Sequence, residues 1–347
     1  MEEITIKDVA KRCGVGISTV SRAINNHPDI NPETKKMVLE VIKETGYIPN
    51  NSARNLKRTD AKCIAVLIKG ITNPFFSAAI STIEAQAQRK KYAMVIQHVE
   101  AYEDEVEVAL ELIKEKRLRG IIFLGGAFLH EKNKLAKLNV PFVFSTIGTV
   151  QDARKKKVYS NIAVDDKAES KKMVNYLISL GHRNIAIIAE GVNAASVGQL
   201  RLEGYKEALE ENGILVNPKL ICEIDDKIDP YSMENGYQTT KKLLNSQEAF
   251  TAVFAVADFL AVGVCRALYE AGKRIPEDVS VAGYDGIAIG EYYIPRLTTI
   301  KQPIEEMSEK TVKLLLDVIE GKCQHEHLVF PAELVVREST GCPAGVK

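Results

Sequence analysis

The spacing of apolar residues in the first fifty positions predicts three short helices. Residues 17–24 place apolar side chains on one side of a helix and polar side chains on the other. A helical pattern that begins near residue 6 comes before it, and Gly14 permits a sharp turn between the two. Two helices joined in this way are typical of a helix-turn-helix unit, which reads DNA through its second helix.

Local signals mark where these helices begin and end. Thr5 and Asp8 have the spacing of a capping box at the start of the first helix. The third helix begins with Asn31 as its N-cap and Pro32 at its first position, and it ends at Gly46. On this third helix we expect four apolar residues to face inward: Met37, Val38, Val41 and Ile42.

Residues 47–58 form a polar segment between the three helices and the rest of the chain. The segment can form one or two helical turns after an asparagine cap. An isolated helix of this length is marginal in water. We therefore expect it to be ordered only when DNA or a partner supports it.

From Cys63 onward, runs of β-branched residues alternate with helical patterns. Near-continuous apolar strands separated by helices predict an α/β fold with parallel sheets covered on both faces. The irregular, charged residues 151–161 indicate a break between two such lobes. The expected strands are 63–68, 93–97, 120–124, 140–144, 185–189, 220–224, 252–256 and 279–283. The expected helices include 78–91, 103–116, 169–180, 199–212, 232–244 and 258–271.

The composition is that of a globular protein with local charge differences. The 347 residues are 46% hydrophobic and have a formal net charge of zero. Residues 1–60 contain ten basic and eight acidic groups, a modest basic bias that suits phosphate contacts. The N-terminus has no apolar run, and no later stretch reaches the roughly 18 apolar residues that span a bilayer. We therefore expect a cytoplasmic protein with no membrane partner.

The sequence gives little support for catalysis, a cofactor or a metal. The six cysteines are scattered without CxxC spacing, which favours free thiols over zinc or redox chemistry. His325 and His327 lie two residues apart without further ligands. No GxGxxG, GxxxxGK[ST] or GxSxG motif is present. We expect no enzyme activity, no cofactor and no metal site.

Eight short motifs in order along the chain resemble those of the lac repressor/galactose repressor family of bacterial transcriptional regulators. Each motif alone is weak, but together they cover essentially the whole sequence. They are Ile-Lys-Asp-Val-Ala at 6–10, Gly-Val at 14–15, Thr-Val-Ser-Arg at 19–22, Tyr-Ile-Pro-Asn at 47–50, Leu-Gly-His-Arg-Asn-Ile at 180–185, Arg-Leu-Glu-Gly-Tyr at 201–205, Gly-Tyr-Asp at 283–285 and Leu-Thr-Thr-Ile-Lys-Gln-Pro at 297–303.

The resemblance implies a DNA-binding head, a hinge helix, and a two-lobed core like that of periplasmic sugar-binding proteins. On this basis we expect the head at 1–50, the hinge at 51–60 and the effector-binding and dimerisation core at 61–340. The chain would cross between lobes three times. Residues 63–162 and 293–322 would form one lobe, and 163–292 and 323–340 the other.

The resemblance also implies which residues contact DNA. Ile17, Ser18 and Arg22 would face base edges in the major groove, where arginine can donate two hydrogen bonds to guanine. Phosphate contacts are expected from Thr19, Ser21, Asn25 and Tyr47. In the hinge, Arg54 would hold a phosphate while Leu56 enters the minor groove and kinks the site. Arg22 could instead be solvated or bound to phosphate, and Leu56 could pack on the core.

The same resemblance places an effector in the cleft between the lobes, at the carboxyl ends of strands. An aromatic ring can stack on the apolar side of a sugar, while charged groups bracket its hydroxyls. Phe75 or Phe76 could instead be simple core residues. Asp258 follows an alanine where the family often has asparagine, and it could be only a helix N-cap. The expected effector-binding residues are Asn73, Phe75, Phe76, Arg201, Tyr231, Asp258 and Asp285.

These expectations describe a homodimeric transcriptional regulator, most simply a repressor of carbohydrate-utilisation genes. Two heads would bind a palindromic operator in double-stranded DNA, with affinity set by a carbohydrate effector in the cleft. A dimer is favoured because no apolar heptads follow residues 335–340. One alternative is a regulator that answers to a nucleobase or a phosphorylated metabolite as corepressor. A more distant alternative is a solute-binding transport protein, which should carry a secretion signal in place of residues 1–60.

Overall fold

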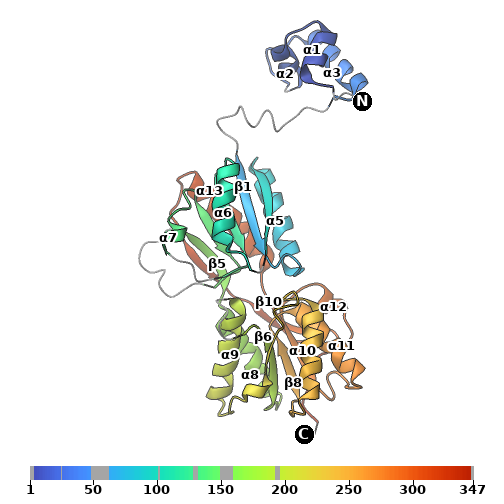
Figure 1. Ribbon diagram of the computed structural model, residues 1–347, viewed down its shortest axis with the longest axis vertical. Coiled ribbons are helices and arrows are strands. Elements are labelled where there is room, and N and C mark those ends of the chain that lie inside the picture. The colour runs from blue at the N-terminus through green and yellow to red at the C-terminus, as the bar shows by residue number, and fades with distance from the viewer. Residues whose placement is uncertain are drawn as a thin grey trace. The chain divides into compact units, whose positions relative to one another are not determined.

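The computed structural model describes residues 4–24, 26–47, 62–100, 102–127, 132–148, 159–191 and 196–344. The chain divides into two compact units, Met1–Ala61 and Lys62–Lys347 (Figure 1). The hinge segment expected at 51–60 lies outside the described residues.

The first unit is a three-helix head. Helices α1 (Ile6–Cys13) and α2 (Ile17–Ile24) meet at the turn around Gly14, whose φ of 63° is the left-handed conformation that glycine tolerates. Helix α3 (Pro32–Thr45) packs against both. The buried side chains of the head come from all three helices: Val9, Ala10, Cys13, Val20, Ala23 and Val38. The predicted helix-turn-helix arrangement is confirmed.

The caps of α1 and α3 have the predicted form. The Asp8 carboxylate accepts a hydrogen bond from the Thr5 backbone N–H at 2.8 Å, which closes the capping box. The Asn31 side chain accepts from the N–H groups of Glu33 and Thr34. Our expectation for Met37 was wrong: it is exposed, because it lies about 100° around the helix from the buried Val38.

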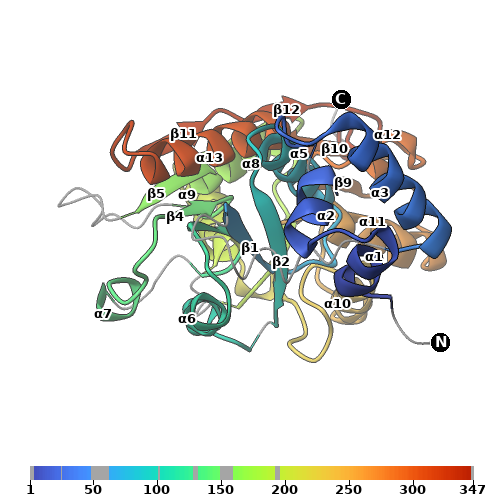
Figure 2. The ribbon, with the colours of Figure 1, turned by 90° about the horizontal axis from the view of Figure 1, so that it is seen from above.

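The second unit contains two six-stranded sheets, one in each lobe. The sheet of lobe one has the order β11-β5-β4-β3-β1-β2, all parallel. Its strands are β1 (Cys63–Lys69), β2 (Ala93–Val99), β3 (Gly120–Leu124), β4 (Phe142–Ser145), β5 (Ser160–Val164) and β11 (His327–Phe330). Helices α5 (Phe75–Arg89) and α13 (Ile304–Ile319) cover one face, and α6 (Glu105–Glu115) and α7 (Lys132–Leu135) lie on the other (Figure 2).

Strand β1 shows why an apolar run forms the centre of this sheet. Its successive side chains alternate between two cores: Ile64, Val66 and Ile68 pack on the side of α5, and Ala65 and Leu67 pack on the side of α6. Because both faces of the strand are buried, a polar side chain at every second position would be buried too, which is unfavourable.

Lobe two repeats this architecture with the strand order β12-β10-β9-β8-β6-β7. Its strands are β6 (Ile185–Ala189), β7 (Ile221–Glu223), β8 (Ala252–Ala255), β9 (Ser280–Asp285), β10 (Thr298–Lys301) and β12 (Glu333–Val335), of which β12 is antiparallel. Helices α8 (Asp166–Ser179) and α9 (Val197–Glu211) pack together, as do α10 (Met233–Asn245) and α11 (Asp258–Glu270) on the opposite side (Figure 1). Two short helices complete the lobe, η1 (Pro218–Leu220) and α12 (Ile289–Tyr292).

The chain passes between the lobes three times, at positions that differ from those expected. We placed residues 293–322 in lobe one, but β10 pairs with β9 and so belongs to lobe two. We placed residues 323–340 in lobe two, but β11 pairs with β5 in lobe one. The passages therefore follow β5, β10 and β11, three short strands that were not among the expected ones.

No helix among the described residues is long and apolar enough to cross a membrane. In the same residues, no group of three or more His, Cys, Asp or Glu side chains could hold a metal ion.

Candidate functional site

Helix α2 presents a polar face away from the core of the head. Val20 and Ala23 hold the helix against α1 and α3, and the opposite surface exposes Ile17, Ser18 and Arg22. Ile17 is 45% exposed, unusually high for an isoleucine inside a small domain. The structure therefore brings together the three side chains that we expected to face base edges.

The residues expected to contact phosphates have more varied positions. Thr19 and Ser21 are half-buried on α2. The Tyr47 ring packs against the core of the head, beyond the end of α3. Asn25, Arg54 and Leu56 lie outside the described residues. The phosphate and minor-groove contacts therefore stay predictions.

In the second unit, Arg201 is the centre of a buried polar network. It lies in the second turn of α9, and it contacts Asp166 through both Nε and a terminal nitrogen at 2.8 Å. Another terminal nitrogen donates to the Val256 carbonyl at 2.6 Å, and the guanidinium stacks 3.7 Å above the Tyr284 ring. Burial disfavours the charge of Arg201, but the Asp166 carboxylate keeps its pKa above the usual value.

Asp285, at the carboxyl end of β9, joins this network to lobe one. The Asn73 amide, which follows β1 in lobe one, donates to Asp285 Oδ2 at 3.2 Å. Gln302 donates to Asp285 Oδ1 at 2.9 Å, and an Arg201 nitrogen lies 3.7 Å from the same atom. Three of the predicted effector-binding residues, Asn73, Arg201 and Asp285, thus meet where the lobes join.

The conformation and ionisation of Asp285 are both unusual. Its φ is 113°, which a residue with a Cβ rarely adopts. Burial raises the pKa of Asp285 to about 6, although the Arg201 charge and the hydrogen bonds from Asn73 and Gln302 act in the opposite direction. Such perturbed groups are typical of ligand sites.

Asp258 is fully buried, but it is not the N-cap of α11, which is Ala257. Its Oδ2 accepts from the N–H groups of Gly286 and Ile287, both at 2.8 Å, and its Oδ1 accepts from the Thr299 hydroxyl at 2.6 Å. The N-cap interpretation is therefore wrong. Asp258 holds the loop that follows β9, so it positions the segment next to Asp285.

Phe75 and Phe76 begin α5 and are 4% and 8% exposed. Both belong to the large core cluster, and their rings meet edge to face with centroids 5.4 Å apart. The Phe76 ring lies against Gly70 and Gly125, in the turns that follow β1 and β3. Each ring is thus packed as a core residue at the carboxyl edge of the sheet.

Tyr231 precedes α10, and its buried hydroxyl lies beside the Glu190 carboxylate. Gly198, in the first turn of α9, leaves room for this hydroxyl and for Glu190. A Cβ at this position would lie 3.2 Å from Tyr231 Oη and 2.7 Å from Glu190 Oε2, so the two groups are close to each other. Glu190 follows β6 directly, and it accepts a hydrogen bond from the Ser196 hydroxyl.

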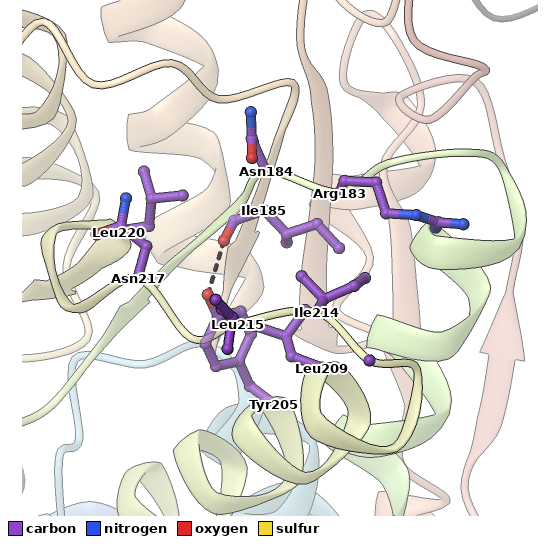
Figure 3. Close-up of a pocket in the computed structure, with 10 residues that line it drawn as sticks. Arg183, Asn184, Ile185, Tyr205, Leu209, Ile214, Leu215, Asn217 and Leu220 are labelled. Atoms are coloured by element: carbon purple, nitrogen blue, oxygen red, sulfur yellow. Dashed lines mark hydrogen bonds between the residues drawn. The ribbon is translucent and has the colours of Figure 1, made fainter.

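A hollow of about 360 Å³ lies elsewhere on lobe two, around the beginning of β6 (Figure 3). It is lined by Ile185, the end of α9 and the η1 turn, and Tyr205 closes one wall by donating to the Ile185 carbonyl at 2.8 Å. The beginning of β6 is the end away from Glu190. The hollow is therefore separate from the Arg201 network.

Sequence reasoning missed four members of the polar network. Tyr284 and Gln302 lie inside motifs that carried the family resemblance, but we had given them no role. Asp166 and Glu190 had a weaker signal: each lies just beyond the carboxyl end of a strand that it follows, β5 or β6. Clusters of carboxylates, amides and one arginine can bind and orient hydroxyl groups by charge-assisted hydrogen bonds.

Comparison with known proteins matches the two units separately and the chain as a whole. Residues 5–50 match the family described as "Bacterial regulatory proteins, lacI family", and residues 174–340 match the "Periplasmic binding protein-like domain". The HTH-type transcriptional regulator MalR of Clostridium butyricum is 39% identical over 339 residues, covering 97% of this chain and 99% of MalR.

Two solved structures are similar over nearly the full length. The lac repressor dimer bound to operator and the anti-inducer ONPF has a TM-score of 0.76 at 28% identity, covering 98% of this chain and all of that one. The transcriptional regulator CelR in complex with cellobiose has a TM-score of 0.69 at 29% identity, covering 97% and 99%.

Proposed function

Because the chain belongs to the lacI family of bacterial regulatory proteins, it is a DNA-binding transcriptional regulator rather than an enzyme or a transport protein, and we propose that it represses carbohydrate-utilisation genes in the cytoplasm. A homodimer binds a palindromic operator through two heads, and a sugar in the interlobe cleft sets its affinity for DNA. This effector site consists of Asn73, Arg201, Tyr231 and Asp285, with Asp258 supporting it and with Phe75 and Phe76 packed behind it at the edge of the core of lobe one.

One observation carries this proposal: a buried polar network joins the lobes at the carboxyl ends of their strands. Asn73 of lobe one donates to Asp285 of lobe two, and Arg201 lies within 3.7 Å of Asp285. A ligand that engages both lobes there changes the angle between them. Effector and operator affinities are then coupled reciprocally through one conformational equilibrium.

The dimer is supported by the surface of the core and by the dimeric lac repressor structure. Strand β2 is an edge strand of its sheet, and Ile96 on it is 46% exposed. Lobe two exposes further large apolar side chains, Tyr269, Tyr292 and Ile294. Burial of such residues against a second copy stabilises a dimer.

The DNA interface is formed by the exposed face of α2. Arg22 reads guanine, Ser18 and Ile17 contact neighbouring bases, and Ile17 is suited to a thymine methyl group. Contacts to the DNA phosphates position the operator, and they come from Thr19, Ser21, Asn25, Tyr47 and Arg54. Leu56 enters the minor groove and kinks the centre of the operator.

The test is DNA binding by fluorescence anisotropy, on a palindromic site selected from random DNA by the protein itself. The affinity should fall steeply with salt, and a sugar should change it. Arg22→Ala should weaken specific binding by roughly tenfold to a hundredfold per head, with little effect on random DNA. Arg89→Ala, which removes an exposed arginine of α5, is the control. Equal losses on both DNAs would refute base reading by Arg22, and no site selection at all would refute the function.

A further inference from the structure

The polar groups around the lobe junction carry more negative than positive charge. Two cations that reach it from described segments are Arg201 and Lys69. Arg201 is bound to Asp166 and lies near Asp285, and Lys69 lies 3.3 Å from Glu105. Both cations are thus already paired with buried carboxylates.

Glu190 adds a carboxylate that these cations do not neutralise by contact. It comes directly after β6, so it faces the same edge of the sheet as Asp285 after β9. Its electrostatic surroundings include Arg201 from its own lobe, Lys69 from lobe one, and Asp226, a further carboxylate of lobe two. Burial raises the pKa of Glu190, because a buried carboxylate with incomplete compensation resists ionisation.

A donor group lies beside this carboxylate. Gly198 has no side chain, and this lets Glu190 Oε2 and the Tyr231 hydroxyl approach the same point above the first turn of α9. The Tyr231 hydroxyl is buried, and the group beside it is the Glu190 carboxylate, to which it can donate. A carboxylate can accept from several donors and a phenol oxygen can also accept, so the two groups together can satisfy two neighbouring hydroxyls of a sugar.

We propose that Glu190 is a specificity-determining residue, which limits the effector to uncharged polyhydroxy compounds and rejects phosphorylated or carboxylated sugars. This inference rests on the proposed function, in which the effector occupies the interlobe cleft. Hydroxyl groups donate to the Glu190 carboxylate, whereas a phosphate or carboxylate in their place adds negative charge next to Glu190, and the two cations nearest to Glu190 among the described residues, Arg201 and Lys69, are already paired with Asp166 and Glu105.

The test must separate ligand recognition by Glu190 from a structural role of the same residue, because the Ser196 hydroxyl also links Glu190 to the start of α9. Glu190→Gln keeps the shape and a hydrogen-bond acceptor for Ser196 while it removes the charge. Glu190→Asp keeps the charge. Glu210→Gln removes a charge from an exposed position near the far end of α9 and serves as a matched control.

The experiment measures dissociation constants by calorimetry for neutral and anionic members of four pairs. The pairs are maltose and maltose 6′-phosphate, cellobiose and its 6′-phosphate, ribose and ribose 5-phosphate, and glucose and glucuronate. We expect the wild type to bind a neutral sugar at least about tenfold more tightly than its anionic partner. Glu190→Gln should reduce that ratio by about tenfold, whereas Glu190→Asp and Glu210→Gln should leave it unchanged.

Each other outcome overturns the inference in a distinguishable way. If the wild type binds an anionic member as tightly as its neutral partner, the specificity assignment is wrong and the regulator proposal stands. The same follows if Glu190→Gln leaves the ratio unchanged, or if Glu210→Gln lowers it equally. If no carbohydrate of either charge binds, the inference and the carbohydrate effector both fail. Specific operator binding by the same sample then shows that DNA regulation itself survives.

Discussion

At the scale of single residues, Asp258 shows how a buried carboxylate is tolerated. All three of its hydrogen bonds come from the protein, two from backbone N–H groups and one from the Thr299 hydroxyl. These donors compensate only part of the lost hydration. Burial, reinforced by the nearby Asp285 charge, raises the pKa of Asp258 to about 8. The folded protein therefore holds a proton here that the unfolded chain releases near its ordinary pKa of 3.8.

This difference predicts that the stability of the core falls as pH rises. The contribution is fully present below the unfolded pKa near 4, and it is lost as pH rises through the folded pKa near 8. Between pH 6 and pH 8 the free energy of unfolding should decrease by about 2 kcal/mol from this group. Urea denaturation at pH 6, 7, 8 and 9 measures the slope.

Asp258→Asn is the informative variant for this prediction. Its carbonyl oxygen can still accept from Gly286 and Ile287, and its amide can donate to the Thr299 oxygen, so it imitates the protonated acid. The decline between pH 6 and pH 8 should shrink in Asp258→Asn. An identical slope in both proteins would show that Asp258 does not hold this proton.

At the scale of elements, two glycines set the contact between α10 and α11. A Cβ on Gly263 would lie 2.0 Å from the Met233 carbonyl oxygen, and a Cβ on Gly236 would lie 2.1 Å from that of Leu260. Real Cβ atoms do not approach backbone oxygens so closely. The two helices are therefore as near as they are because neither carries a side chain at the crossing.

Gly263→Ala should therefore destabilise the core, although the same change inside an exposed helix stabilises by about 1 kcal/mol. Overpacking should force the helices apart and cost about 1–3 kcal/mol, measured as a lower urea midpoint at an unchanged slope. Circular dichroism should report the same helix content. Equal or higher stability in Gly263→Ala would contradict the close packing.

The elements that sequence reasoning found and missed differ in composition. Apolar strands such as β3 and β6 were predicted at their observed bounds, because both faces of a parallel sheet are buried. Strands β5 and β10 were missed, because buried Ser160, Asn161, Thr298 and Thr299 make hydrogen bonds within the fold that apolar periodicity does not reveal. The lobe boundaries expected from the family resemblance could therefore not be checked against strand predictions in these segments.

The residues of the proposed effector site, like the strands, were predicted only in part. Family motifs indicated Arg201 and Asp285, and the structure joins them to Asn73 from the other lobe. The importance of Asp166 depends on its 2.8 Å contact with Arg201, which lies 35 residues away. No local pattern in a single sequence contains such a pairing.

At the scale of the core unit, side chains of lobe two hold each of the three passages between the lobes. Asp166, just after the first passage, is bound by Arg201. Gln302 in the second donates to Asp285. In the third, Ala332 N–H donates to Glu169 at 3.3 Å, and Lys172 donates to the Ala332 carbonyl at 3.0 Å. These contacts attach the three passages to lobe two, and a different kind of contact joins residues of the two lobes directly.

The Asn73–Asp285 hydrogen bond is such a contact, and it predicts the behaviour of Asn73→Asp. The new carboxylate can still accept from the Phe75 N–H, as Asn73 does at 3.0 Å, but it faces Asp285 with like charge. Repulsion should disfavour the closed arrangement of the lobes and reduce the effector-induced change in operator affinity by about tenfold or more. The measurement is operator anisotropy with and without the neutral sugar that most stabilises the wild type.

The pH dependence of this variant separates repulsion from a simple loss of the hydrogen bond. Burial raises the pKa of Asp285 to about 6 in the wild type, and a second carboxylate in place of the donating Asn73 amide raises it further. Towards pH 6 the two carboxyl groups can therefore share a proton, and the effector response should partly return. Asn73→Ala lacks the charge and should give no such recovery, and Asn245→Asp, at an exposed position on α10, should behave as the wild type. If the response of Asn73→Asp equals that of Asn73→Ala at every pH, the effect comes from the lost hydrogen bond and repulsion has no part in it. If it equals the wild type, the contact across the cleft has no part in transmitting the effector signal.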